Sequence, residues 1–78
     1  MSRLPLCSSA EIVRALQRAG FRKAHSSGSH QTMEKQIGGR TITTVVPLGK
    51  REVPRGTLRG ILRLAEMSQV EFRKHLRS

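Results

Sequence analysis

The segment from residue 21 to residue 46 constrains the fold of this 78-residue chain more than any other part. It lacks the 3.6-residue period of a helix and is enriched in β-branched residues. Two turn signals divide it, Ser-Ser-Gly at 26–28 and Gly-Gly at 38–39. The pattern predicts an antiparallel meander of three short strands, over about residues 21–25, 29–35 and 40–46.

A helix over residues 9–19 is expected before the strands. Ser8 can accept a hydrogen bond from the third amide of this helix while Glu11 reaches back to the Ser8 amide, the reciprocal pattern of a capping box. Apolar residues then recur at helical spacing: Ile12, Val13, Ala15, Leu16 and Ala19. Gly20 supplies the left-handed residue that ends many helices.

Two further helices are expected after the strands. Pro54 stands where the first helical position would use its fixed φ. An apolar stripe follows it: Leu58, Ile61, Leu62 and Ala65. A second capping box, Ser68 with Glu71, opens a short terminal helix that is expected to bury Val70 and Phe72.

These elements predict an α+β fold of order α-β-β-β-α with an added C-terminal helix, in which the helices lie on one face of a three-stranded antiparallel sheet. A chain of this length has room for one thin core. Residues 1–78 are therefore expected to form a single domain.

The charge of the chain indicates an anionic partner. Fifteen Lys and Arg against five acidic residues give a formal net charge of +10, whereas solubility requires a magnitude of only roughly 2 to 8. Nucleic acid, an acidic protein or a membrane surface would each suit this excess. No apolar run approaches the ~20 residues of a membrane span, and the first residues lack the apolar core of a signal peptide. We expect a cytoplasmic protein with no membrane partner.

The residue types argue against a metal site or a resident cofactor. The chain has no Asp, no two His at helical ligand spacing, and no room for a separate cofactor domain. The single cysteine, Cys7, has no partner for a disulfide. It is expected in an untethered N-terminal stretch, where nothing would hold a base beside its thiol.

Two short motifs carry a resemblance to a known family. Gly-Ser-His at 28–30 opens the second expected strand, and Gly-Thr-Leu-Arg at 56–59 with Ile-Leu at 61–62 lies on the second helix. With the order of elements, they resemble the HicA toxin family over nearly the whole chain. The resemblance implies a fold like the double-stranded-RNA-binding domain, metal-independent cleavage of messenger RNA, and neutralisation by a HicB-like antitoxin. It also implies that His30 is catalytic.

Two positions depart from the family pattern. Many members carry a histidine near the proline after the third strand, but Pro47 is followed here by Leu48, Gly49 and Lys50. A second catalytic imidazole is therefore not expected in that loop. Glu66 stands where a glycine is usual after the second helix, which should cost a little stability at the helix end.

The chemistry of the motif agrees with cleavage of RNA. A base must take the 2′-hydroxyl proton while donors stabilise charge on the phosphate, and a histidine, with an ordinary pKa of ~6.5, can give or take a proton near neutrality. Gly28 would let the backbone approach a phosphate, and the Ser29 hydroxyl could donate to it. The alternative for His30 is a solvated histidine beside a turn. His25 could flank His30 as a second acid or base, or be a surface residue.

Basic residues are the expected ligands of the RNA. We interpret Lys23, Arg40 and Lys50 as phosphate ligands around His30. A stripe of arginines repeats every four residues on the second helix: Arg55, Arg59 and Arg63. Arg55 and Arg59 are interpreted as RNA-binding, with docking of an acidic antitoxin and a solvated helix face as the alternatives.

Three classes of function remain: a ribonuclease toxin, a catalytically inert double-stranded-RNA-binding module, and a basic adaptor that docks on an acidic protein. The Gly-Ser-His motif favours the first, while composition and fold serve the second equally well. A helix-turn-helix regulator is disfavoured, because the strand region separates the first two helices.

Overall fold

The computed structural model describes residues 3–77, which form an α+β fold in the expected order. The elements are α1 (Ser9–Arg18), β1 (Arg22–Ser27), β2 (His30–Ile37), β3 (Arg40–Pro47), α2 (Arg55–Leu64) and α3 (Gln69–Arg77). The strands pair antiparallel in the order β1-β2-β3, which confirms the meander.

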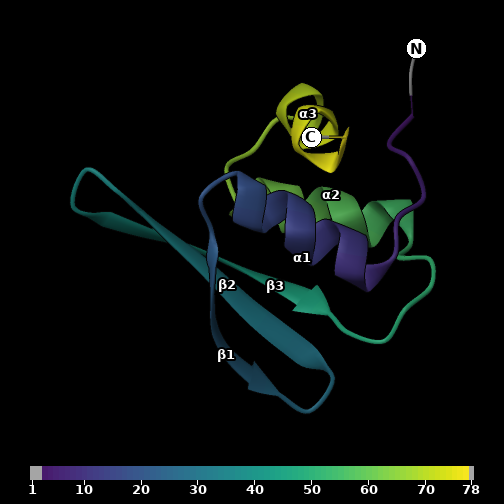
Figure 1. Cartoon of the computed structure of the whole chain (residues 1–78), viewed down its shortest axis with the longest axis horizontal. Coiled ribbons are helices and arrows are strands. Elements are labelled where there is room, and N and C mark those ends of the chain that lie inside the picture. Colours follow the sequence, from purple (N-terminus) through teal and green to yellow (C-terminus); the bar gives the residue numbers. More distant parts are fainter. Residues whose placement is uncertain (1–2, 78) are drawn as a thin grey trace.

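The helices lie on one side of the sheet (Figure 1). Helices α1 and α2 both pack on β3, and α3 lies beyond α1, away from the sheet. No element of residues 3–77 covers the opposite face of the sheet. Burial in β3 alternates accordingly, with Ile42, Thr44 and Val46 buried and the residues between them exposed. This arrangement confirms the expected helices on one face.

Local signals set both ends of α1. The Ser8 hydroxyl accepts a 3.1 Å bond from the Glu11 amide, and the Ser8 amide donates a 2.8 Å bond to Glu11 Oε1. At the other end, Gly20 has φ +103° and the Phe21 amide donates a 2.9 Å bond to the Leu16 carbonyl. Phe21 is thereby folded into the core, so β1 begins one residue later than expected.

Two glycine turns fix the register of the sheet. Gly28 has φ +58° at the first position of the two-residue turn between β1 and β2, as a type II′ turn requires. Gly38 and Gly39 have φ +53° and +80°, as a type I′ turn requires. The first turn sets Ser27 opposite His30.

A bulge in β1 was not expected from the sequence. Lys23 pairs with Met33, but the next pair is His25 with Thr32, so Ala24 is an extra residue on β1. Cross-strand partners share a face of the sheet. The bulge therefore moves His25 onto the face of Thr32, which it would not reach in a regular strand.

One hydrophobic cluster holds the layers together. It includes the apolar stripes expected on α1 and α2, together with Met33, Ile42 and Val46 from the sheet. Thr44 is buried among them, and its hydroxyl donates a 2.8 Å bond to the Ile61 carbonyl of α2. This bond satisfies the buried hydroxyl and fixes α2 on β3.

The expected burial of Val70 is wrong. Its side chain is 63% exposed, whereas Phe72 is fully buried. Residues two positions apart lie about 200° apart around a helix, so the two cannot face α1 together. The larger aromatic ring takes the inward position.

Pro54 precedes α2 as its N-cap and is not the first helical residue, as had been expected. Its φ of −56° suits a helix, but its ψ of 143° is extended. Helical dihedral angles therefore begin at Arg55, one residue later.

The segment around Cys7 is not untethered, which corrects the expectation. Cys7 is 1% exposed and pairs with Val53, whose amide donates a 2.7 Å bond to the Cys7 carbonyl. Arg55 Nε donates a 2.6 Å bond to the Leu4 carbonyl nearby. Burial, and then the Glu11 charge, raise the pKa of the Cys7 thiol above its ordinary value of 9.0. Cys7 is therefore a core residue and a poor nucleophile.

None of the helices in residues 3–77 is long and apolar enough to cross a membrane.

Candidate functional site

Three segments meet at the end of the sheet where β2 begins. They are the turn at 28–29, the loop that follows β3, and the N-terminus of α1. The Leu48 amide donates a 2.6 Å bond to the Ser29 carbonyl, which ties the loop to the turn. His30 follows this turn directly as the first residue of β2, with Ser27 and Pro47 as its partners on the neighbouring strands. The backbone of His30 is therefore held from both sides.

Ser9 ties the same loop to α1. Its hydroxyl donates a 2.6 Å bond to the Pro47 carbonyl and accepts a 3.0 Å bond from the Lys50 amide. Its own amide donates a 3.0 Å bond to the Lys50 carbonyl. Ser9 is 5% exposed. The loop is thus fixed between α1 and the turn that carries His30.

His30 is exposed on the uncovered face of the sheet. Its neighbour Gln31 is buried on the helix side, and successive side chains of a strand point to opposite faces. A substrate can therefore reach the imidazole without displacing a helix.

The bulge at Ala24 places His25 on this same face. His25 is paired with Thr32, and its Nε2 lies 3.4 Å from the Thr32 hydroxyl oxygen. His30 is two residues from Thr32 along β2, so it is a diagonal neighbour of His25. Diagonal neighbours in an antiparallel pair lie roughly 7–8 Å apart, within reach of large side chains. The two histidines therefore flank one patch of the sheet.

Arg40 lies at the far end of the sheet from His30. It opens β3 opposite Ile37, seven residues from Pro47, or roughly 23 Å along the strand. Its guanidinium donates two bonds, of 2.8 and 2.9 Å, to the Glu66 carboxylate. This pairing lowers the pKa of Glu66 and raises that of Arg40. The structure does not bring Arg40 to the phosphate position expected beside His30.

The other predicted cations divide between the site and α2. Lys23 faces the helix side of the sheet near the start of β1, opposite Met33, and Lys50 lies in the loop fixed by Ser9. Arg55 is half-buried and engaged with the N-terminal segment. Arg59 is exposed on α2 beside the start of α3. The structure brings Lys50 to the end of the sheet that carries His30, whereas Lys23 pairs with a residue three positions further along β2 and lies on the opposite face of the sheet.

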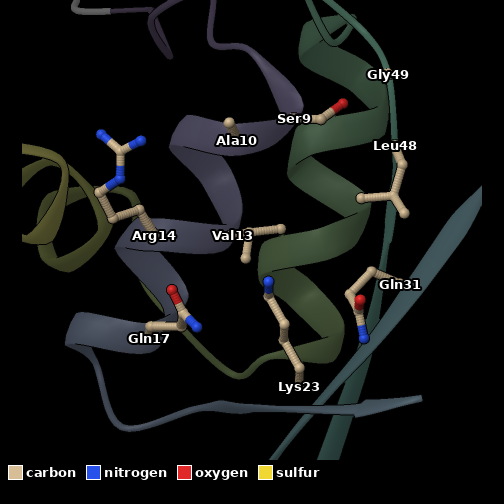
Figure 2. Close-up of a pocket in the computed structure, with 9 residues that line it drawn as sticks. All are labelled: Ser9, Ala10, Val13, Arg14, Gln17, Lys23, Gln31, Leu48 and Gly49. Carbon is tan, nitrogen blue, oxygen red and sulfur yellow. The ribbon is translucent and has the colours of Figure 1, made fainter. Parts of the chain in front are cut away.

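A pocket of about 400 Å³ lies between α1 and this end of the sheet (Figure 2). It is lined by Ser9, Ala10, Val13, Arg14, Gln17, Lys23, Gln31, Leu48 and Gly49. His30 does not line it, because its side chain points to the other face. Of these residues, only Lys23 was expected from the sequence to bind a ligand. The polar residues of α1 at positions 14 and 17, one turn apart, were a signal that could have pointed to the pocket.

Gly28 has a conformational requirement in this site. A Cβ built on it would meet no atom within 4 Å, but its φ of +58° is strained for any L residue with a side chain. The glycine is therefore needed for the turn that precedes His30, in addition to any role in admitting a phosphate. Among residues 3–77, no three His, Cys or carboxylate side chains gather closely enough to hold a metal ion.

The comparisons with known proteins identify the family. The family model described as the HicA toxin of bacterial toxin-antitoxin systems matches residues 9–67, from the first residue of α1 to just beyond α2. The comparison with curated proteins finds no match. The matched span includes the turn, His30 and the fixed loop. The chain belongs to the HicA toxin family and is a toxin of a bacterial toxin-antitoxin system.

Proposed function

We propose that this toxin is an endoribonuclease that cleaves messenger RNA without a metal ion, with His30 as its catalytic histidine. The observation that carries the proposal is the placement of His30: an exposed imidazole on a backbone fixed by hydrogen bonds on both sides. Positioning of this kind lets one imidazole meet a substrate in a reproducible geometry.

The proposed reaction is an internal transfer at phosphorus. One histidine takes the proton of the ribose 2′-hydroxyl, and the 2′-oxygen attacks the adjacent phosphorus. The bond from phosphorus to the 5′-oxygen breaks, and that oxygen takes a proton from a second acid. The products are a 2′,3′-cyclic phosphate and a 5′-hydroxyl, and no oxidant or further reactant is needed.

His25 is suited to the second proton transfer. It shares the uncovered face with His30, and its Nε2 is near the Thr32 hydroxyl, which would limit its rotation. A pair of imidazoles in opposite protonation states can act as base and acid in one step. Replacing His25 should therefore remove one limb of the pH–rate profile, while replacing His30 should abolish cleavage.

The cations take different parts in the proposal. Lys50 lies at the His30 end of the sheet and would bind a phosphate near the cleaved bond, whereas Lys23 lines a pocket on the opposite face and would bind a phosphate on the helix side of the sheet. Arg40 would contact RNA only at a distance from this bond. Arg59, exposed on α2, is available either to RNA or to a HicB-like antitoxin.

The antitoxin is proposed to work by covering His30. The uncovered sheet face is where a partner would have to sit to exclude RNA. Protection of RNA should then become complete at a fixed stoichiometric ratio of antitoxin to toxin. Rescue of growth by an antitoxin whose complex still cleaves RNA would contradict this mode of inhibition.

Cleavage of RNA by the purified protein in excess EDTA tests the proposal. The parent and the His75→Ala variant should cleave, and the His30→Ala variant should not, after all three are shown to be folded. His75 is a matched control because it lies in α3, outside the family match. If none of the proteins cleaves RNA while salt-sensitive binding persists, the inert RNA-binding module replaces the proposal.

A further inference from the structure

Apart from Lys23, the residues that line the pocket between α1 and the sheet have no part in the proposed cleavage. Its two cations, Arg14 and Lys23, come from α1 and β1, and Val13 and Leu48 provide apolar surface between α1 and the loop. A volume of about 400 Å³ accommodates a small organic molecule. Positive charge beside apolar side chains is complementary to a nucleotide, which joins an anionic phosphate to a planar base.

Gln31 gives the pocket a fixed polar group. It is 8% exposed, and its Nε2 donates bonds of 2.9 Å to the His25 carbonyl and 3.0 Å to the Thr32 carbonyl. Both amide hydrogens are therefore engaged with the backbone. The side-chain carbonyl is the part of Gln31 that can accept a hydrogen bond from an amino or imino group of a base.

The pocket is connected to the candidate catalytic turn. Gln31 follows His30 directly in β2, and Leu48 donates its amide hydrogen to the Ser29 carbonyl. The pocket opens on the helix side of this end of the sheet, whereas the His30 side chain lies on the uncovered face. A single RNA strand that passes around this end could contact both.

We propose that this pocket binds one nucleotide of the RNA substrate, adjacent to the phosphodiester that is cleaved. The phosphate lies against Arg14 and Lys23, and the base lies on Val13 and Leu48 with Gln31 as a hydrogen-bond acceptor. This assignment rests on the proposed function, because it takes the substrate to be RNA. It provides single-strand recognition in a chain that has no Trp or Tyr on which to stack bases.

Titration with AMP, GMP, CMP and UMP, each alone, tests the site independently of cleavage, because a nucleoside monophosphate has no phosphodiester to cut. Methyl signals of Val13 and Leu48 should shift on saturation with at least one of them. Lys23→Ala should weaken this binding at least fivefold. Lys74→Ala removes the same charge from an exposed position of α3 outside the pocket, and it should weaken binding less than twofold.

A second variant tests the pocket without changing the charge of the protein. Ala10 lines the pocket from an exposed position on α1, so Ala10→Phe should occupy the space without disturbing the core. It should abolish the methyl shifts and raise KM for RNA more than it lowers kcat. Equal losses in Lys23→Ala and Lys74→Ala, or shifts confined to other residues, would overturn the proposal.

The outcomes separate this inference from the proposed function. If the parent cleaves RNA but no monophosphate shifts the pocket methyls, the pocket assignment fails and the ribonuclease stands. If monophosphates bind in the pocket but the parent cleaves no RNA, the nucleotide site stands and the ribonuclease fails.

Discussion

Ser9 is a single residue on which the geometry of the candidate site depends. Its hydroxyl satisfies the Pro47 carbonyl and the Lys50 amide, and the loop between them is bonded to the turn before His30. In the sequence it is one more polar residue at the start of a helix. Its role arises from contacts about forty positions away.

Replacing Ser9 with alanine should lower both stability and activity. Two part-buried backbone groups lose their hydrogen-bond partner, which costs at most about 1–3 kcal/mol in the free energy of unfolding. The loosened loop should reduce RNA cleavage by about tenfold or more. Ser68→Ala is the matched control: it removes the hydroxyl that caps α3, costs about 1 kcal/mol, and should leave cleavage unchanged. Equal cleavage by the two variants, measured at a temperature where both are folded, would show that Ser9 does not position the site.

Glu66 combines a strained backbone with an ion pair. It has φ +54°, where glycine is favoured, and its carboxylate binds Arg40. The Arg40 hydrogen bond lowers the Glu66 pKa below its ordinary value of 4.5. A carboxyl with a lowered pKa in the folded state contributes stability above its ordinary pKa and loses that contribution as the pH falls through the lowered value.

Relative to the parent, the stability of Glu66→Gly should therefore increase most at acidic pH. The variant relieves the backbone strain at every pH, and as the pH falls through the lowered pKa of Glu66 the parent loses the ion pair that offsets this gain. The difference in thermal midpoint between variant and parent should be larger at pH 3 than at pH 7. Glu66→Gln keeps the strain without the charge, so it should show no gain at either pH. A Glu66→Gly advantage that shrinks in acid would contradict the sign of this linkage.

Among the elements, α3 lies outside the family match and yet contributes to the core. Phe72 is fully buried, and Arg18 of α1 donates a 2.9 Å bond to the His75 carbonyl. These contacts show that α3 is part of the folded domain. The contribution of α3 should therefore appear in the free energy of unfolding.

Phe72→Ala should cost about 3–5 kcal/mol of unfolding free energy, a large part of the about 5–15 kcal/mol that a small domain possesses. Val70→Ala, on the exposed side of the same helix, should change it by about 0.5 kcal/mol or less. Chemical denaturation measures both. Similar small effects from the two substitutions would mean that α3 does not stabilise the fold.

The elements that could be predicted are those with local causes. The capping box at Ser8, the turn glycines and the apolar stripes act over a few residues, so the order of helices and strands followed from the sequence. The bulge at Ala24, the pairing of Cys7 with Val53 and the partner of Arg40 depend on contacts between distant segments. These contacts decide which way His25 faces and place Arg40 away from His30.

At the scale of the whole molecule, the charge of +10 on 78 residues should dominate RNA binding. The logarithm of the binding constant for single-stranded RNA should fall linearly with the logarithm of salt concentration, with a slope of about −0.7 for each phosphate neutralised. The His30→Ala variant allows this measurement without cleavage. Lys23→Ala in the His30→Ala background should make this slope less negative by about 0.7, which is the contribution of one phosphate. A response that is flat in salt would exclude electrostatic binding as the main contribution.

The ends of the cleaved RNA report the chemistry at His30. A defined single-stranded RNA is incubated with the parent and the His30→Ala variant in excess EDTA, and the termini of the fragments are identified by mass spectrometry. We expect 2′,3′-cyclic phosphate and 5′-hydroxyl ends from the parent and intact RNA from the variant. Fragments with 5′-phosphate ends, or equal cleavage by the variant, would contradict this expectation.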